Sequence, residues 1–203
     1  DVDRLIEEGY YGLNVTVPLK EDAYKYCDNT SDVARTLKAV NTLIVNKDGV
    51  YGDNTDPIGF EKSIANKGLN NKLCLVLGAG GSARAVVYAL THMKCEIGIY
   101  NRTIENAESL CSDLGVEATV LTEKTISEFI RSSHLVVNTT SLGQQKGEEN
   151  NLIDFDSLNS SAHVYDLIYN PSKTTFLRHA EKNGCTVQNL SLIHISEPTR
   201  RGI

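Results

Sequence analysis

The segment VLGAGGSARA, residues 76–85, has the composition and spacing of a phosphate-binding turn. Gly78, Gly80 and Gly81 follow an apolar run typical of a buried strand and precede a helical pattern. Glycines at such a turn let backbone N–H groups approach a pyrophosphate at the helix N-terminus. Ala83 stands where the usual fingerprint has its third glycine, and it is small enough for the same close packing. The pattern predicts a dinucleotide site; a strand–helix turn without a ligand is the alternative.

The end of the next expected strand indicates which dinucleotide would bind. An NAD site has an Asp or Glu there that accepts a hydrogen bond from the ribose 2′-OH. This sequence has Asn101, Arg102 and Thr103 instead, with no carboxylate. The planar cation of Arg102 suits a 2′-phosphate, so the segment favours NADP. The alternative is that Arg102 is a solvated arginine at a strand end.

A lysine and a carboxylate in the first part of the sequence could transfer a proton. Lys20 stands at the expected start of a helix, where a positive charge is unfavourable to the helix dipole. Asp56 ends the polar segment GDNTD. On either side of a cleft facing a nicotinamide, the two would form a proton-transfer pair for carbonyl reduction, while the hydride carries the electrons. Taken alone, each is more often a solvated or capping residue.

The elements that must position these residues fall into two regions. Before residue 57 the pattern predicts a strand at residues 13–17, two helices with Ser31 as an N-cap, and a hairpin around Asp48-Gly49. From Pro57 onward strands and helices alternate, beginning with a helix expected over Ile58 to Lys67. This alternation predicts an α/β fold with a doubly wound parallel sheet of Rossmann type. We expect a partial substrate-binding domain over residues 1–56 and an NADP-binding domain over residues 57–189.

Composition excludes several classes of function. The net charge of −6 argues against a general binder of nucleic acid or anionic membranes. The five cysteines are an odd number without a C-x-x-C pair, which indicates reduced thiols in a cytoplasmic protein and no metal site. No apolar run approaches the ~18 residues of a transmembrane helix, and no signal peptide is visible.

Seven motifs occur in one order: NVTVPLK, AVNT, GDNTDxxG, GAGGSARA, NRT, NTTSLG and YDLIYNPxxTxFL. This ordered set resembles the shikimate dehydrogenase family over Gly9 to Asn189. The resemblance implies the reversible, NADPH-dependent reduction of 3-dehydroshikimate to shikimate in aromatic amino-acid biosynthesis, by a monomer or homodimer. A quinate/shikimate dehydrogenase is the alternative within the same class.

The resemblance also implies roles for individual residues. Lys20 would be the catalytic acid/base and Asp56 its partner on the substrate hydroxyls, with Asn14 as support. The other substrate-binding residues would be Thr16, Asn41 and Tyr169. The cofactor-binding residues would be Gly78, Ala79, Gly80, Gly81, Ser82, Ala83, Asn101, Arg102, Thr103, Thr140, Ser141, Leu167 and Asp32. A helix first-turn acid is an equally good account of Asp32.

The sequence also departs from the family pattern. It begins after the segment whose Ser-x-Ser motif binds the substrate carboxylate in the family. Asn106 stands where many members have a second arginine, which predicts weaker selectivity for NADP. Pro57 replaces a common glycine at a possible hinge.

The end of the sequence does not follow the family. Members continue with a GLGMLVxQ motif, whereas this sequence has LSLIHISEPTRRGI over residues 190–203. The stretch LSLIHISEPTR resembles the translation of a sequencing adapter, so we interpret residues 190–203 as a non-native tail; a divergent native tail is the alternative. We therefore expect the 203-residue chain to bind NADP weakly and to oxidise shikimate negligibly, as a nucleotide-binding module would.

Overall fold

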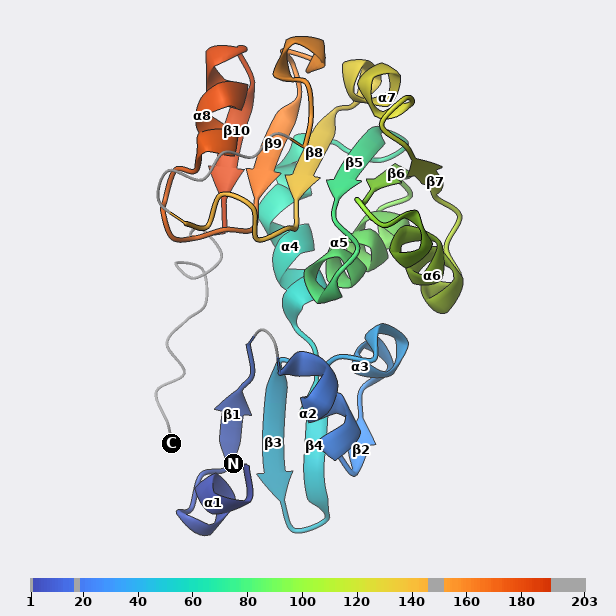
Figure 1. Ribbon diagram of the computed structural model, residues 1–203. Helices are drawn as coiled ribbons and strands as arrows, with labels where there is room; N and C mark the ends of the chain where they lie inside the picture. Colours follow the sequence, from blue (N-terminus) through green and yellow to red (C-terminus); the bar gives the residue numbers. More distant parts are fainter. Residues whose placement is uncertain (1, 17–18, 146–151, 191–203) are drawn as a thin grey trace. The chain divides into compact units, whose positions relative to one another are not determined.

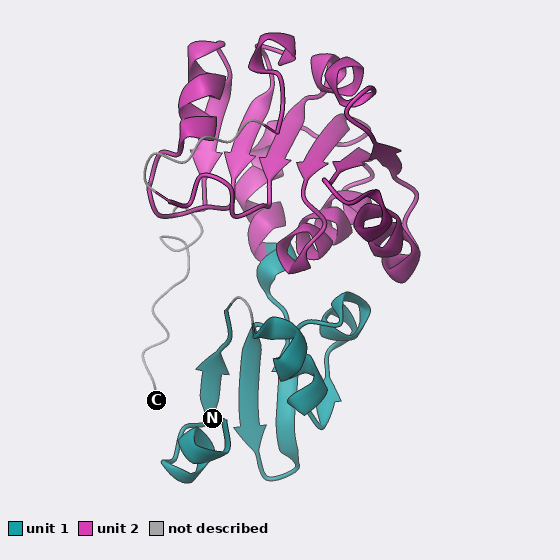
Figure 2. Ribbon diagram, viewed as in Figure 1, with its two compact units in different colours: residues 1–58 teal, residues 59–203 magenta. Residues whose placement is uncertain are grey.

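The computed structural model describes residues 2–16, 19–145 and 152–190. The chain divides into two compact units, unit 1 over residues 1–58 and unit 2 over residues 59–203 (Figure 2). The division falls two residues beyond the boundary predicted at residue 56. It lies inside helix α4 (Asp56–Ile64), which begins two residues before the helix predicted from Ile58.

Unit 1 is a four-stranded mixed sheet with three short helices (Figure 1). The strand order is β1-β3-β4-β2; β3 pairs antiparallel with β1 and β4, and β2 runs parallel to β4. Its small core contains Ala34, Val40 and Leu43, all fully buried. The elements are α1 (Val2–Glu7), β1 (Gly12–Asn14), α2 (Lys20–Tyr26), β2 (Asn29–Thr30), α3 (Asp32–Leu37), β3 (Thr42–Asn46) and β4 (Gly49–Asp53).

Local sequence signals account for most of these elements. The Ser31 hydroxyl accepts a hydrogen bond from the Ala34 N–H at 3.1 Å, so it caps α3 as predicted. The predicted hairpin is present, but its two-residue loop is one position earlier than expected, because Asn46 pairs with Gly49. The strand predicted over residues 13–17 is limited to Gly12–Asn14, and residues 17 and 18 lie outside the described residues.

Unit 2 contains a six-stranded sheet whose strands are all parallel, in the order β10-β9-β8-β5-β6-β7 (Figure 1). The order reverses between β5 and β8, as in the Rossmann fold, which confirms the predicted fold class. The strands are β5 (Leu73–Leu77), β6 (Glu96–Tyr100), β7 (Thr119–Leu121), β8 (Leu135–Asn138), β9 (His163–Asp166) and β10 (Thr186–Asn189). The helices after α4 are η1 (Ala65–Lys67), α5 (Gly81–His92), α6 (Ile104–Leu114), α7 (Ile126–Ser132), η2 (Phe155–Ser157) and α8 (Thr175–Lys182).

Helices cover both faces of this sheet, so its strands are buried on both sides. On one face Cys74 and Val76 of β5 join a core cluster with residues of α4, α5 and α6. On the other face Leu75 and Leu77 join a cluster with residues of α7 and α8. Alternate residues of one strand thus enter two separate cores, which holds the carboxyl ends of the strands in a rigid row.

His163 of β9 is 5% exposed and connects β9 to β10. Its Nδ1 lies 2.9 Å from the Thr186 hydroxyl and its Nε2 lies 3.1 Å from Gln188 Oε1. Burial, with a further contribution from the nearby Lys67 charge, lowers the pKa of His163 from 6.5 to about 4. The folded protein therefore keeps this imidazole neutral over a pH range in which the unfolded chain protonates it.

We expect His163 to destabilise the protein on acidification. The pKa of His163 is lower in the folded protein than in the unfolded chain. Its contribution to the free energy of unfolding is therefore complete above about pH 6.5 and is lost as the pH falls to about 4. Between those pH values the unfolding free energy of the wild type should fall by up to about 3 kcal/mol more than that of the variant His163→Gln. Urea unfolding at several pH values measures this difference. An unfolding free energy that changes equally with pH in both proteins would contradict the expectation.

Among the described residues no helix is both long enough and apolar enough to cross a membrane. The same part of the chain holds no group of three or more His, Cys, Asp or Glu side chains placed to bind a metal ion. All five cysteines are free thiols.

Candidate active site

The predicted proton-transfer residues of unit 1 lie together in the structure. Lys20 is the first residue of α2 and Asp56 is the first residue of α4. Asn41 lies immediately before β3, and its backbone N–H donates to the Asp53 carbonyl at the end of β4. The Lys20 carbonyl accepts from the Val40 N–H at 2.9 Å, which fixes the start of α2 beside the start of β3.

The side chains of these residues form one hydrogen-bonded cluster. Lys20 Nζ lies 2.6 Å from Asp56 Oδ2, in an ion pair whose side chains are 18% and 33% exposed. The other carboxylate oxygen, Asp56 Oδ1, accepts from Asn41 Nδ2 at 2.8 Å. Asn41 Oδ1 in turn accepts from the Thr55 N–H and the Thr42 hydroxyl, which fixes the orientation of the amide. The ion pair is thus held from the Asp56 side and keeps part of its surface accessible to a ligand.

The backbone of the Asp56 segment is held by a second asparagine. The side chain of Asn54 is buried, donates to the Ala39 carbonyl at 2.9 Å, and accepts from the Asp56 N–H at 3.1 Å. This contact satisfies the first backbone N–H of α4 and positions the Asp56 carboxylate. The arrangement is suited to acid–base chemistry: the ammonium can donate a proton, and the fixed carboxylate orients it.

The remaining predicted residues of unit 1 are more peripheral. Thr16 and Asn14 are exposed, and the Thr16 carbonyl accepts from the Leu19 N–H at 2.9 Å, just before Lys20. Asp32 is exposed in the first turn of α3 and forms an ion pair with Arg35 at 2.9 Å. The ion pair supports the helix-acid interpretation of Asp32, so its contact with a cofactor stays a prediction.

In unit 2 the glycines of the turn after β5 are required for different reasons. Gly78 has φ +107°, and a Cβ there would lie 2.6 Å from Thr139 Oγ1 and 3.0 Å from Thr140 Cγ2. The fold itself therefore requires glycine at this position. In contrast, a Cβ at Gly80 or Gly81 would meet no atom within 4 Å. No atom of the described residues fills that space, so it is open there to a ligand that approaches the backbone closely.

The helix that follows this turn is suited to an anion. Helix α5 has 12 residues, no acid in its first turn, and no side-chain cap at Gly80. Its free N–H groups and its dipole favour a phosphate. Ala83 is fully buried in the core, as its replacement of the third glycine predicts, whereas Ala79 and Ser82 are partly exposed.

The end of β6 presents polar groups without a carboxylate. Asn101 Nδ2 donates to the Thr103 carbonyl at 2.8 Å, and Thr103 lies at the N-cap of α6. Arg102 is exposed and makes no hydrogen bond or ion pair with any other described residue, so its guanidinium is available. Asn106 is also exposed, one turn further on.

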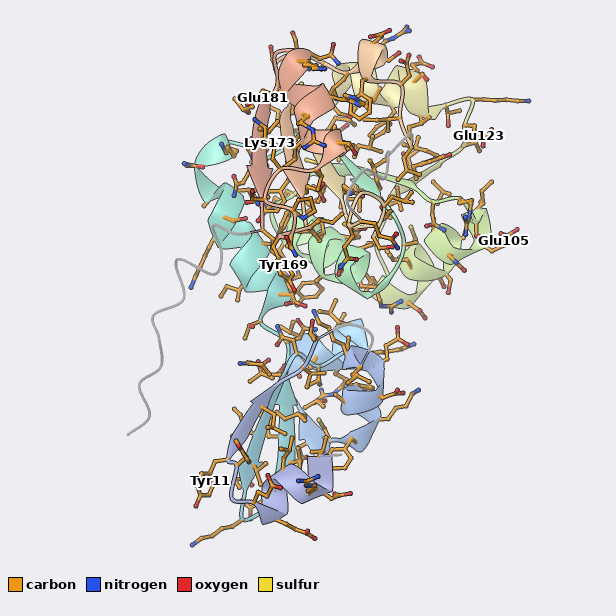
Figure 3. All side chains as sticks on the ribbon, turned by 60° about the vertical axis from the view of Figure 1, so that its left-hand side comes forward. Tyr11, Glu105, Glu123, Tyr169, Lys173 and Glu181 are labelled. Carbon is orange, nitrogen blue, oxygen red and sulfur yellow. The ribbon has the colours of Figure 1, made fainter. Side chains whose placement is uncertain are left out.

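Two further loops at the carboxyl end of the sheet carry predicted cofactor and substrate residues. Thr140 and Ser141 follow β8; Thr140 is half-buried and Ser141 is exposed. Leu167 follows β9, and its N–H donates to the Asn138 carbonyl at 3.0 Å. Tyr169 lies further along the same loop and is 61% exposed (Figure 3).

Sequence reasoning missed two groups of polar residues. Thr55, inside the GDNTD segment, donates its N–H to Asn41 and accepts from the Asn41 amide at 3.0 Å. Asn138, Asp166 and Thr174 are fully buried, and Asp166 accepts a hydrogen bond from each of the other two. The sequence held one signal for this group, because Asn138 and Asp166 are polar residues that each end an apolar strand. A polar residue at such a position seldom faces the core, so the signal did not indicate burial.

A parallel sheet whose strand order reverses next to a glycine turn defines a dinucleotide-binding protein of the Rossmann class. The chain belongs to the shikimate dehydrogenase family. Residues 1–43 match the family profile described as "Shikimate dehydrogenase substrate binding domain", and residues 61–145 match "Shikimate / quinate 5-dehydrogenase".

Known proteins of this family resemble the chain over most of its length. It is 41% identical over 192 residues to shikimate dehydrogenase (NADP(+)) of Roseobacter denitrificans, covering 91% of this chain and 69% of that protein. The chain spans only 65 or 66% of the length of three further curated shikimate dehydrogenases.

Solved structures share the fold of both units. The crystal structure of shikimate 5-dehydrogenase from Thermus thermophilus in complex with NADP(H) and shikimate has a TM-score of 0.82 and 32% identity, covering 94% of this chain and 70% of that one. Quinate dehydrogenase from Corynebacterium glutamicum in complex with NAD has a TM-score of 0.83 and 29% identity, covering 96% and 72%.

Proposed function

We propose that the protein reduces 3-dehydroshikimate to shikimate with NADPH, reversibly, as a shikimate dehydrogenase. The observation that carries this proposal is the cluster in which Lys20 pairs with Asp56 and Asn41 holds the carboxylate. Such a pair suits the proton half of a carbonyl reduction. The transfer of a hydride from NADPH is supported by the names of the curated relatives and by the glycine turn of unit 2.

Bound NADPH supplies the hydride that reduces the carbonyl carbon. Lys20 donates a proton to the carbonyl oxygen as that oxygen gains negative charge, which yields the alcohol and leaves a neutral amine. In the reverse direction the neutral amine takes the hydroxyl proton. Asp56 stabilises the ammonium form and accepts a hydrogen bond from a substrate hydroxyl, and Asn41 keeps the carboxylate in position.

We assign the substrate-binding domain to residues 1–56 and the cofactor-binding domain to residues 57–189, with Tyr169 and Asp32 each contributing from the other domain. Thr16, Asn41, Asp56 and Tyr169 would hold the polyol, with the exposure of Thr16 and Tyr169 in support. The pyrophosphate would lie against the open backbone at Gly80 and Gly81 and the N-terminus of α5. The further cofactor contacts would come from Ala79, Ser82, Ala83, Asn101, Thr103, Thr140, Ser141, Leu167 and Asp32.

NADP is the cofactor that the end of β6 favours. The guanidinium of Arg102 is exposed and available, and it could form a bidentate pair with a 2′-phosphate. Asn106 adds no second positive charge, so we expect the preference for NADP over NAD to depend mainly on Arg102.

Quinate oxidation is the second candidate reaction. It is favoured by the structural similarity to a quinate dehydrogenase and by the family description that names both substrates. Quinate and shikimate share a carboxylate and a hydroxylated ring, so the two activities differ by few contacts. A third candidate is a nucleotide-binding module without turnover.

The test is an assay of NADPH formation from shikimate and from quinate. It uses the 203-residue chain and a chimera completed with the unmatched segments of the Roseobacter relative. We expect faster oxidation of shikimate than of quinate, with NADP preferred over NAD. Arg102→Ala should remove most of that preference, by about tenfold in kcat/KM for NADP. Faster turnover of quinate would favour the second candidate, and NADP binding without turnover in either form would favour the third.

The proposal includes a cytoplasmic location and a monomeric or homodimeric state. The five free cysteines support the location, because thiols persist in reducing compartments.

A further inference from the structure

Asp166 is a buried carboxylate that the proposed reaction does not use. It is the last residue of β9, it is fully buried, and it pairs in register with Asn138, the last residue of β8. None of the ion pairs among the described residues includes it. Burial raises the pKa of Asp166 to about 6, although its hydrogen bonds lower it in part. An acid kept in the core without a cation calls for a reason beyond packing.

Three donors from three different segments converge on this carboxylate. Oδ1 accepts from Asn138 Nδ2 at 3.1 Å and from the Ile168 N–H at 3.0 Å. Oδ2 accepts from the Thr174 hydroxyl at 2.6 Å. Thr174 is itself the N-cap of α8, where its hydroxyl accepts from the Leu177 N–H. Asp166 thus holds both ends of the loop that runs from β9 to α8.

The same network continues into the loop after β8. Asn138 Oδ1 accepts from the Thr140 N–H at 3.1 Å and from the Thr140 hydroxyl at 2.7 Å. The Thr140 hydroxyl then accepts from the Leu142 N–H at 3.2 Å. Thr140 also lies against Gly78, where there is no room for a Cβ. One chain of hydrogen bonds and contacts therefore connects the loops after β5, β8 and β9.

These loops carry Thr140, Ser141, Leu167 and Tyr169, which the proposed function assigns to the cofactor and the substrate. The same proposal gives the pyrophosphate to the turn after β5 and the 2′-phosphate to the end of β6. The loops after β8 and β9, on the other side of the reversal of strand order, are therefore left for the nicotinamide half. Of the residues assigned to the other half, Gly78 touches the network through Thr140, whereas those described at the N-terminus of α5 and the end of β6 form no hydrogen bond with Asp166 or its partners. We propose that Asp166 is a positioning residue that holds the loops after β8 and β9 in the arrangement that binds the nicotinamide half of NADP. This inference rests on the proposed function.

Asp166→Asn tests it with little change of volume. The amide keeps one acceptor but places a donor against either Thr174 or the pair Asn138 and Ile168, so the connection between the loops is weakened. We expect the dissociation constant for NADP to rise about tenfold, the usual size of one lost hydrogen bond. The constant for 2′,5′-ADP, which lacks the nicotinamide half, should change less than about twofold.

Two variants of Thr174 keep the inference testable if Asp166→Asn does not fold. Thr174→Val removes the hydroxyl that reaches Asp166 and should weaken NADP binding selectively. Thr174→Ser restores the hydroxyl and should bind both ligands as the wild type does. Asp154→Asn is the matched control, because Asp154 also accepts from a backbone N–H and a hydroxyl but caps η2.

Selective loss of NADP affinity in Asp166→Asn and Thr174→Val, measured by calorimetry on the 203-residue chain, would support the positioning role. Equal weakening of NADP and 2′,5′-ADP, or no change in either, would overturn it. Failure of the wild type to bind NADP would overturn the proposed cofactor and this inference together. NADP binding without shikimate oxidation by the chimera would contradict only the proposed reaction, and the comparison of the two ligands would still decide the role of Asp166.

Discussion

Replacing Lys20 by alanine is expected to lower kcat for shikimate oxidation by about three orders of magnitude, the range that a positioned acid or base contributes. The ammonium lies 2.6 Å from Asp56, and its loss removes both the proton donor and the partner of that carboxylate. The dissociation constant for NADP should stay within about twofold of the wild-type value, because the residues assigned to NADP lie outside this cluster. Steady-state kinetics and calorimetry measure the two quantities.

Lys25→Ala is the matched control for this prediction. Lys25 lies in the same helix, its side chain is 73% exposed, and its partner is Asp22 in the preceding turn. Its removal should leave kcat unchanged and cost little stability. If Lys20→Ala retained wild-type kcat in a form of the protein that oxidises shikimate, Lys20 could not be the acid/base. A rise of KM alone would instead indicate a role in substrate binding.

Replacing Gly78 by alanine is expected to destabilise unit 2 by about 3 kcal/mol. Two costs add: the positive φ of +107° is strained for any residue with a Cβ, and that Cβ would press against Thr139 and Thr140. The loop after β8 would have to move, so NADP binding should weaken as well. Urea unfolding measures the first effect and calorimetry the second.

Gly80→Ala is the contrasting variant two residues away. Gly80 has φ −86° and ψ −170°, which any residue adopts, and a Cβ there meets no atom within 4 Å. The unfolding free energy of Gly80→Ala should therefore be within about 0.5 kcal/mol of the wild-type value, or higher than it. NADP binding should still fall, because the added methyl group lies where the pyrophosphate approaches. A strongly destabilised Gly80→Ala with unchanged NADP affinity would contradict the assignment of this turn.

Local sequence signals predicted those features that depend on a few adjacent residues. The Ser31 cap, the hairpin and the glycine turn each follow from the chemistry of one short segment. The alternation of strands and helices after Pro57 was enough for the fold class, because few topologies accommodate it. The start of α4 at Asp56 was missed, since it depends on Asn54 accepting the Asp56 N–H across the turn.

Features that depend on distant segments were not predicted. Strand β2 has two residues, Asn29 and Thr30, and exists because β4 lies beside it; nothing in its own composition indicates a strand. The strand β7 was also missed, although Thr119 and Val120 are β-branched, because its three residues are too few to give a pattern and pair with β6 only in the folded sheet. The hydrogen bonds of Asp166 to Asn138 and Thr174 join segments brought together only by the sheet. A polar residue at a strand end can face either solvent or core, and only tertiary packing decides between them.

The reversal of strand order at β5 also determines when unit 2 can fold. β5 is the first strand of its sheet in the chain, but one of its two neighbours is β8, which follows β6, α6, β7 and α7. During synthesis β5 therefore has one open edge until β8 has left the ribosome, and closing so long a loop slows folding. An exposed apolar edge of this kind is a site for aggregation and for chaperones. The central strand β5 is thus synthesised first, but its pairing on both edges is completed only when β8 is available.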